Sequence, residues 1–336
     1  MSEIHALAAR SAGGPLVPFS YDPGPLGDEQ VELEVLYCGI CHSDVAMHKN
    51  EWGMTKYPFV PGHEAIGRVV ALGSDAKLVK QDQIVGLGWN SGSCLFCSQC
   101  LAGDHNMCST LEQTIVARHG AFATRVRCHW VWATPLPEGV DPAKAGPLFC
   151  GGITVFNALL QEDVLPIHRV AVIGIGGLGH MALQFFNKWG CDVTAFTSSE
   201  AKGEEAKKLG AHHIIDTHNA DALRKARFDF ILSTVTAPLN WDSYVQSLAP
   251  RGRFHIVGVP PEPLSIGAFP LIGAQRSVGG SPSGAPGTVA KMLDFCARHS
   301  IAAVTEEFPM SKANEALAHL EAGKARYRVV LNNDLA

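Results

Sequence analysis

The chain has 336 residues, of which 46% are hydrophobic and 18% charged, and its formal net charge is −5 at pH 7. This length suits two domains rather than one core, and no block of Lys and Arg provides the basic surface expected for nucleic acid. The N-terminal residues carry no basic-then-apolar leader and no run of about eighteen apolar residues occurs, so we expect a cytoplasmic protein without nucleic-acid or membrane partners.

The first half of the chain, residues 1–151, is expected to form a β-rich domain. Short runs that alternate apolar and polar residues, such as residues 31–38 and 63–73, are broken by Gly and Pro. This pattern is typical of half-buried strands in a compact β-rich unit.

Two motifs at the ends of these runs combine with a later cysteine into a candidate open metal site. Cys41 lies in CGICHSD, His63 lies in PGHEAIG, and Cys150 follows much later in LFCGG. Two cysteines and one histidine are a ligand set that leaves zinc a fourth position for a substrate oxygen. Taken alone, a lone cysteine is usually a small buried hydrophobe and a lone histidine an ordinary core or surface residue.

A second cysteine motif is much denser. Four cysteines fall within fifteen residues, with spacings of two, two and seven residues between them: Cys94, Cys97, Cys100 and Cys108. Four thiolates at such spacing converge on one tetrahedral zinc ion and leave no position for substrate, which predicts a structural site. Disulfides are disfavoured because a cytosolic chain keeps its thiols reduced, and a redox switch is the remaining alternative.

The rhythm changes at about residue 152, where apolar strands begin to alternate with helices. Strand-like runs at residues 169–174, 191–199 and 228–235 are each followed by a helical run. Alternation of this kind predicts a doubly wound parallel sheet, here over residues 152–292. The helical and strand-like tail, residues 293–336, is expected to return to the first domain.

A glycine-rich turn separates the first of these strands from its helix. The turn comprises Gly174, Gly176, Gly177, Leu178 and Gly179. Glycines there allow a tight turn and a close approach of the backbone to a pyrophosphate, which the N-terminus of the helix attracts. Placed inside a strand–helix–strand unit, the turn predicts dinucleotide binding.

The end of the second strand indicates which dinucleotide binds. A carboxylate about twenty residues after the glycine turn is typical of NAD sites, because it accepts hydrogen bonds from the ribose. Here the strand ends in Thr197, Ser198 and Ser199, with Lys202 one turn later. Hydroxyls and a lysine suit the 2′-phosphate of NADP(H), whereas Glu200 is counter-evidence and the serines also suit a plain helix cap.

Taken in order along nearly the whole chain, the motifs resemble those of one family. GICHSD, PGHE, the four-cysteine cluster, CGGIT and GIGGLGH resemble the zinc-dependent medium-chain alcohol dehydrogenases, and EWG, SPSG and KARYRVV resemble their cinnamyl-alcohol-dehydrogenase-like subgroup, which includes bacterial aldehyde reductases. The resemblance implies an α/β protein with a GroES-like catalytic domain and a Rossmann domain. It further implies two zinc ions, reversible hydride transfer between NADP(H) and primary alcohols or aldehydes, and a homodimer formed through the cofactor domain.

The resemblance also implies roles for residues around the open site. Catalytic zinc is expected on Cys41, His63 and Cys150, with Glu64 as a transient ligand and Asp44 orienting the His63 ring.

Proton transfer and cofactor contacts follow from the same resemblance. Ser43 is expected to carry the proton, and His42, Thr154 and Arg328 are expected to contact the cofactor. Many relatives continue the proton relay through a histidine five residues after the first zinc cysteine, but Ala46 occupies that position. Water, the cofactor ribose or His48, two residues later, remain as exits for the proton, and His48 is interpreted as a plain surface residue.

The substrate pocket is expected to include Trp52 and Trp89, which flank the metal motifs, although both equally suit a core.

Two alternative functions would require other sequence features than those found here. A polyol dehydrogenase often has a carboxylate in place of the third ligand, Cys150 here, and an acidic residue for the ribose. A non-catalytic zinc-ribbon protein needs neither the open site nor the glycine turn.

Overall fold

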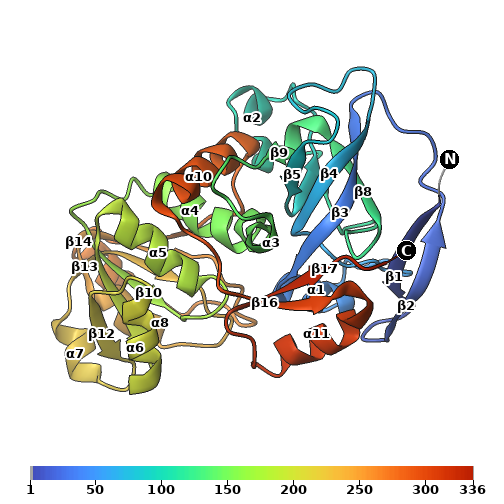
Figure 1. The fold of residues 1–336 in the computed structure, drawn as a ribbon. Coiled ribbons are helices and arrows are strands. Elements are labelled where there is room, and N and C mark those ends of the chain that lie inside the picture. The colour runs from blue at the N-terminus through green and yellow to red at the C-terminus, as the bar shows by residue number, and fades with distance from the viewer. Residues whose placement is uncertain (1–2, 336) are drawn as a thin grey trace. The chain divides into compact units, whose positions relative to one another are not determined.

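A computed structural model describes residues 3–335, which divide into two compact units (Figure 1). Unit 1 comprises the chain up to residue 153 and from 284 onward, and unit 2 comprises residues 154–283. The second crossing precedes the expected boundary at 292/293, because helix α10 (Pro286–His299) contacts β9 (Thr134–Pro135) of unit 1. Within the described residues no single helix is long and apolar enough to span a membrane, and one bent helix pair, 142–149 with 151–161, passes that test by length and composition alone.

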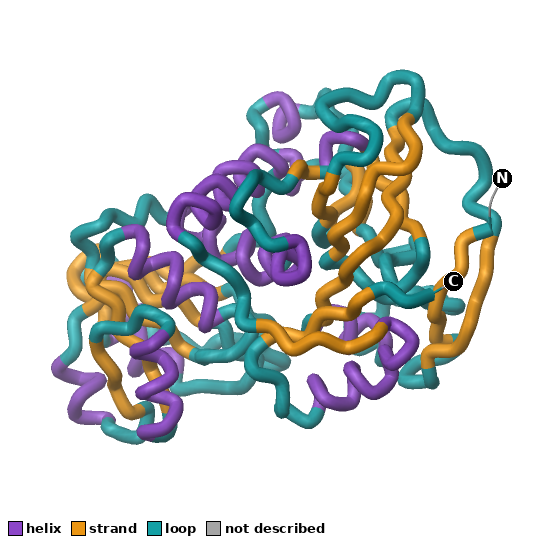
Figure 2. The backbone as a smooth tube through the Cα atoms, in the orientation of Figure 1, coloured by secondary structure: helices purple, strands orange, loops and turns teal. Residues whose placement is uncertain are grey.

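Unit 1 is built on a seven-stranded sheet, drawn in orange in Figure 2. Its order is β16-β17-β3-β4-β5-β9, and β8 also pairs with β3. Two further sheets, β1-β2 and β6-β7, have two strands each. The other strands of unit 1 are β1 (Ile4–Ala9), β2 (Leu16–Tyr21), β3 (Gln30–Ile40), β4 (Ala65–Leu72), β5 (Ile84–Leu87), β6 (Asn90–Gly92), β7 (Glu112–Gln113), β8 (Arg125–His129), β16 (Thr305–Pro309) and β17 (Arg328–Asn332).

Strand β3 is the centre of this sheet and leads directly to the first metal motif. Its residues Val31, Leu33 and Val35 are at most 2% exposed and pack into the core of unit 1. The next strand, β4, runs antiparallel to β3, with Cys38 opposite Ala65. The end of β3 and the start of β4 therefore lie at the same edge of the sheet, so the chain segments carrying the two expected ligand motifs meet there.

Short helices connect the strands of unit 1, and one helix begins there and continues into unit 2. This shared helix, α4 (Gly151–Gln161), starts at the residue after Cys150. The other helices of unit 1 are α1 (His42–His48), α2 (Ser98–Leu101), α3 (Pro142–Ala145), α11 (Ala313–Glu321) and the 3₁₀ segments η1 (His105–Met107), η2 (Trp130–Trp132), η3 (Gly146–Phe149) and η4 (Met310–Lys312).

Unit 2 is a parallel six-stranded sheet with the order β12-β11-β10-β13-β14-β15. In sequence order this is 3-2-1-4-5-6, the doubly wound topology of dinucleotide-binding domains, as the sequence predicts. Strand order reverses between β10 and β13, and ligands of such sheets bind at that point. The strands are β10 (Arg169–Ile173), β11 (Asp192–Thr197), β12 (His213–Asp216), β13 (Phe228–Ser233), β14 (Leu248–Ile256) and β15 (Ser277–Gly280).

The helices of unit 2 follow these strands along the chain. Aromatic side chains, among them Phe196, Phe228 and Phe254, form a core with residues of α8. The helices are α5 (Gly179–Trp189), α6 (Glu200–Lys208), α7 (Ala220–Lys225), α8 (Trp241–Gln246) and α9 (Ala268–Ile272).

Candidate active site and metal centres

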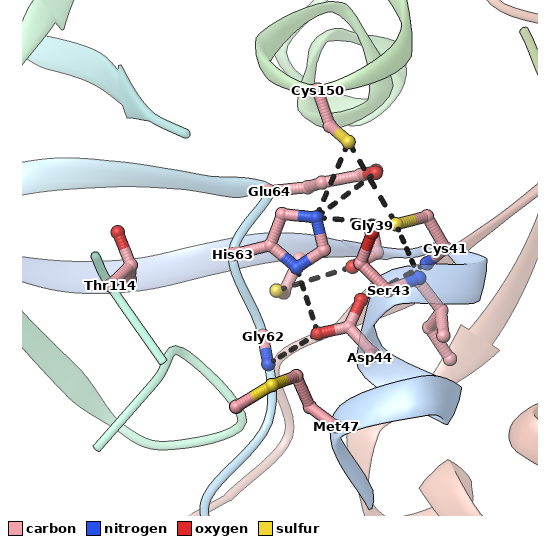
Figure 3. A network of polar contacts seen from close by, with 12 residues as sticks. Gly39, Cys41, Ser43, Asp44, Met47, Gly62, His63, Glu64, Thr114 and Cys150 are labelled. Atoms are coloured by element: carbon pink, nitrogen blue, oxygen red, sulfur yellow. Dashed lines mark hydrogen bonds and ion pairs between the residues drawn. The ribbon is translucent and has the colours of Figure 1, made fainter. Parts of the chain in front are cut away.

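The first metal centre lies at the edge where β3 ends and β4 begins (Figure 3). Cys41 caps the N-terminus of α1, and its Sγ accepts a hydrogen bond from the backbone N–H of Ser43 at 3.2 Å. Asp44 completes the cap, because its Oδ2 accepts the backbone N–H of Cys41 at 3.0 Å. The cap therefore fixes both the cysteine and the carboxylate relative to the helix.

The same carboxylate orients the histidine. Asp44 Oδ1 lies 2.9 Å from His63 Nδ1 and also accepts the backbone N–H of Gly62 at 2.9 Å. With Nδ1 protonated toward Asp44, the lone pair on His63 Nε2 faces the sulfur atoms. Neither Asp44 nor His63 is exposed to solvent, so the structure has the arrangement that the resemblance implied.

The three expected ligands converge. His63 Nε2 lies 3.2 Å from Cys41 Sγ and 3.3 Å from Cys150 Sγ, and the two sulfurs are 3.8 Å apart. Two thiolates that bind the same zinc ion at about 2.3 Å are roughly 3.8 Å apart in a tetrahedral site. The donor types and the sulfur separation therefore both fit zinc.

Glu64 is the fourth member of this buried group. Its Oε1 forms an ion pair with Nη2 of Arg328 and lies 4.0 Å from His63 Nε2, whereas its Oε2 is buried without a hydrogen-bond partner. Burial raises the pKa of Glu64 to about 7, although the Arg328 guanidinium opposes this rise. All four donor groups lie within 4.8 Å of one another, so Glu64 is close enough to join the ligands.

Two glycines make room for this arrangement, and sequence reasoning missed both. A Cβ on Gly39 would overlap Oε2 of Glu64, and a Cβ on Gly62, which has φ +103°, would lie 2.7 Å from the Phe122 ring. Both glycines lie inside the metal motifs, and this position is the sequence feature that could have identified them.

Arg328 was expected to contact the cofactor, and the structure gives it partners within unit 1. The side chain is 2% exposed, and its Nη2 also donates to the carbonyl of Ile40 at 3.3 Å. It comes from β17, whose residue Val329 pairs with Ile40 at the end of β3.

The interpretation of His48 as a surface residue is wrong. Its side chain is 7% exposed because α1 packs against the turn after β1, where His48 Nε2 lies 2.6 Å from the carbonyl oxygen of Gly14. Ala46, at the position of the relay histidine, is also fully buried.

Aromatic rings lie beside the metal centre. The Trp89 ring meets the His63 ring edge-on, with centroids 5.1 Å apart, and Trp52 meets Trp89 in the same way at 6.0 Å. Trp52 is 37% exposed, whereas Trp89 contacts the small buried cluster of Met47 and Phe59. The structure thus brings Trp89 to the ligand histidine and Trp52 to Trp89.

The four-cysteine segment forms the second metal centre. Cys94 Sγ lies 3.6 Å from Cys108 Sγ and 4.0 Å from Cys100 Sγ, and all four sulfurs fall within 4.8 Å of one another. A backbone N–H from Cys94 lowers the pKa of Cys108 to about 6, and one from Cys100 lowers that of Cys97. These separations and the stabilised thiolates fit a closed tetrahedral zinc site.

The dinucleotide elements lie in unit 2. After β10 the chain turns at Gly174, with φ +87°, and the carbonyl of this glycine accepts the Thr234 hydroxyl at 2.7 Å, where the strand order reverses. A Cβ on Gly179 would overlap the Gly174 carbonyl oxygen, whereas a Cβ on Gly176 would meet open space. Gly179 thus allows helix α5 to pack close, and Gly176 leaves the backbone open to a ligand.

Known proteins share these features. Residues 27–138 match the alcohol dehydrogenase GroES-like domain, and residues 177–298 match the zinc-binding dehydrogenase domain. The aldehyde reductase AdhA of Synechocystis is 55% identical over 332 residues, covering 98% of this chain and 99% of the relative.

Solved structures agree with this match. The cinnamyl alcohol dehydrogenase SbCAD4 of Sorghum bicolor is similar with a TM-score of 0.93 and 34% identity, covering 98% of each chain. The Helicobacter pylori CAD, solved with NADP(H), has a TM-score of 0.90 and 27% identity, again covering 98% of each chain.

Fold, zinc-ligand geometry and similarity together define a zinc-dependent medium-chain alcohol dehydrogenase, and the chain belongs to the cinnamyl-alcohol-dehydrogenase-like subgroup of that family. It is an alcohol dehydrogenase or aldehyde reductase with two zinc sites. The sequence-based expectations of family, fold class, reaction and zinc are confirmed.

Proposed function

We propose that this enzyme reduces aldehydes with NADPH and prefers NADPH to NADH. The observation that carries this proposal is the end of β11, where Thr197 is followed by the exposed residues Ser198 and Ser199 rather than by a carboxylate. Hydroxyl groups leave room for the 2′-phosphate of NADPH and donate hydrogen bonds to it, and Lys202 adds a positive charge at the start of α6.

The local structure of this strand end supports a phosphate site. Strands β10 and β11 are parallel neighbours, so Gly174 and Ser198 follow strand ends at the same edge of the sheet. Ser199 caps helix α6, because its Oγ accepts the backbone N–H of Lys202 at 3.5 Å. This cap is compatible with anion binding, since a helix N-terminus attracts negative charge and Ser198 stays exposed. The side chain of Glu200 lies outside the described part of the chain.

The pyrophosphate is proposed to bind over the glycine turn. Helix α5 begins there with Leu178 as its N-cap, and no side chain caps this end. The N–H groups of His180 and Met181 already donate to backbone carbonyls of the turn, so the pyrophosphate is proposed to meet the backbone at Gly176 and Gly177 and the positive end of the helix dipole. We assign His42, which is exposed, and Thr154, which is half-buried, to cofactor contacts as well, and Arg328 to the same role through its position beside Glu64.

When bound, zinc polarises the substrate oxygen and NADP(H) exchanges the hydride. The chain's own residues orient and protonate the substrate. Asp44 keeps the lone pair of His63 Nε2 aimed at the metal position, and the half-buried Ser43 beside Cys41 donates a proton to the oxygen of the reduced aldehyde. His48 is tied to Gly14, so solvent or the cofactor ribose is proposed to resupply the Ser43 proton.

The substrate is proposed to be a primary aldehyde with an aliphatic or aromatic tail. Trp89 packs against His63 and Trp52 packs against Trp89, so the two rings offer an apolar wall to that tail.

Unit 2 carries features that suit the expected homodimer. Strand β15 ends the sheet, and the exposed residues Phe269 and Ile272 of α9 are 84% and 75% accessible. An unpaired edge beside exposed apolar side chains suits pairing with a second copy. A cytoplasmic location is proposed because none of the ten cysteines forms a disulfide, as in a reducing compartment.

The decisive experiment compares kcat/KM for NADPH and NADH with one aldehyde. We expect NADPH to be favoured at least about tenfold, a difference of about 1.4 kcal/mol. The variant Ser198→Asp should remove most of this preference, because its carboxylate repels the 2′-phosphate and accepts hydrogen bonds from the NADH ribose. Ser11→Asp, at an exposed serine of unit 1, controls for the added charge. A wild-type preference for NADH would refute the proposal.

A further inference from the structure

Three side chains of unit 2 form a continuous hydrogen-bonded chain away from the zinc ligands. His255 Nδ1 lies 2.7 Å from Glu162 Oε1, and His255 Nε2 lies 2.9 Å from Ser281 Oγ. The histidine is 1% exposed and comes from β14. Residues far apart in sequence are thus joined through one buried ring.

The two ends of this hydrogen-bonded chain belong to the two segments that lead to and from the crossings between the units. Glu162 is the first residue after α4, the helix that begins next to the zinc ligand Cys150 and contains the crossing at 153/154. Ser281 follows β15 and comes just before the return crossing at 283/284. A second bond joins the same two segments, since Asn157 of α4 donates to the carbonyl of Pro282 at 3.0 Å.

The chemistry of the three groups fixes which atom donates. Burial lowers the pKa of His255, so the neutral ring is favoured. Glu162 accepts a hydrogen bond from the Nδ1–H of His255. This leaves His255 Nε2 to accept a hydrogen bond from the Ser281 hydroxyl. The carboxylate is held from its other side by Arg253, whose Nε is 3.7 Å from Oε2. Each of the three side chains then has a partner, the condition under which a buried polar chain rigidifies its surroundings.

Close packing adds to this restraint. Gly279 of β15 is the register partner of His255, and a Cβ at Gly279 would lie only 3.3 Å from Glu162 Oε1. The bare backbone of β15 therefore allows the end of α4 to approach the strand that leads to Ser281.

We propose that Glu162, His255 and Ser281 act as a clamp that fixes the far end of α4 to the return segment 281–283, and that His255 is thereby a positioning residue for the reaction. Hinges are a few residues at element ends that absorb conformational change, and their loosening commonly alters kcat and KM together. The clamp joins α4, the helix that begins next to Cys150 and contains the first crossing, to the segment just before the return crossing.

The first test is Ser281→Ala in the full-length zinc-loaded enzyme. Hydrogen exchange followed by mass spectrometry should show faster exchange in residues 154–163 as well as in 279–286, although the substitution is remote from the first segment in sequence. Aldehyde reduction should show a lower kcat and a higher KM for NADPH, with kcat/KM reduced about threefold or more. Ser277→Ala, at an exposed serine of β15, is the matched control and should change neither.

The second test separates the clamp from simple stabilisation. His255→Asn retains a donor near the Nδ1 position but is too short to reach Ser281, so it should reproduce the effects of Ser281→Ala. The double variant that combines His255→Asn and Ser281→Ala should be no worse than either single variant, because both substitutions remove the bond between His255 and Ser281. His255→Gln, which reaches Ser281 but loses Glu162, should be as damaging as Glu162→Gln.

Two results for Ser281→Ala would overturn the clamp. One is hydrogen exchange that becomes faster only next to residue 281, and the other is kinetic constants within twofold of the wild type while the melting temperature falls. So would fully multiplicative losses in the double variant. The exchange measurement needs neither substrate nor a cofactor preference, so failure of the clamp is distinguishable from failure of the proposed NADPH specificity.

Discussion

The two metal centres of unit 1 use the same thiol ligands in different surroundings. Around the four-cysteine centre, backbone N–H groups of Cys94 and Cys100 donate to the sulfurs of Cys108 and Cys97. The open centre has one such donor, the Ser43 N–H to Cys41 Sγ, and its ligands also lie among buried charged side chains, namely Asp44, Glu64 and Arg328. Backbone donors stabilise thiolates wherever the loop can fold, whereas buried charges need a prepared pocket. The difference teaches that the four-cysteine centre serves the local fold and the open centre serves the chemistry.

The sharpest way to break this comparison is to remove one ligand of the open centre. Cys150→Ser should abolish aldehyde reduction, by more than about 10³-fold, because substrate activation depends on the metal. One zinc ion per chain should be lost, while the circular dichroism spectrum and melting temperature stay close to those of the wild type. Metal analysis of carefully prepared wild-type protein that finds one zinc or none would contradict the assignment of two centres.

Proton transfer offers the next largest effect. Ser43→Ala should lower alcohol oxidation and aldehyde reduction by about 100-fold, the usual cost of losing a positioned acid-base group. His48→Ala is the control, because its ring is tied to Gly14 and should contribute little to turnover. Steady-state kcat with both variants measures the difference, and equal losses would place His48 in the relay.

The buried carboxylate beside the histidine should have a smaller effect. Asp44→Asn puts an amide where three N–H groups now meet a carboxylate. Either Cys41 N, or Gly62 N together with His63 Nδ1, then loses its acceptor. Loss of such a partner typically costs about 10–100-fold in metal affinity or activity. Zinc affinity measured by competition with a chelator should fall within that range at the open centre. An unchanged affinity would show that Asp44 serves only to cap α1.

The contrast between the centres also explains how far the sequence could lead. The four cysteines predict their own convergence, because all lie within one short segment and need only a loop. Cys41, His63 and Cys150 are far apart in sequence. Their residue types made them candidate ligands, and the resemblance to a family supplied the expectation that they share one zinc ion. Strand β10 and its glycine turn were predictable from the local pattern, because the residues that form a strand or turn are adjacent in sequence.

Tertiary partners were not predictable in the same way. Arg328 stands in a motif that suggests cofactor contact, and only the structure shows that its guanidinium also pairs with Glu64, because β17 joins β3 in the sheet. His48 has an ordinary helical position, and only the turn at Gly14 decides that it is buried. Long-range pairing of strands and turns determines such contacts, and no local pattern encodes it.

The four-cysteine centre should show the smallest effect on turnover and a clear effect on stability. In Cys97→Ser a weaker ligand replaces the thiolate that caps α2, so the segment should lose its zinc ion and its fold. The melting temperature should fall by several degrees, since each 1 kcal/mol corresponds to about 2–4 °C in a domain of roughly 150–250 residues. The protein that remains folded should retain one zinc ion and a kcat within about twofold of the wild type, because Cys41, His63 and Cys150 keep their own contacts.

Cys191→Ser, at a buried cysteine outside both centres, is the matched control for the sulfur-to-oxygen change in Cys97→Ser. It should leave both zinc ions in place, so that zinc content separates loss of a ligand from loss of a buried thiol. Calorimetry together with metal analysis and active-site titration of the same samples measures stability, zinc content and turnover per folded chain. Loss of both zinc ions in Cys97→Ser would show that the two centres are coupled. A loss of activity that neither the unfolded fraction nor the zinc content explains would show the same, and the division between fold and chemistry would be wrong.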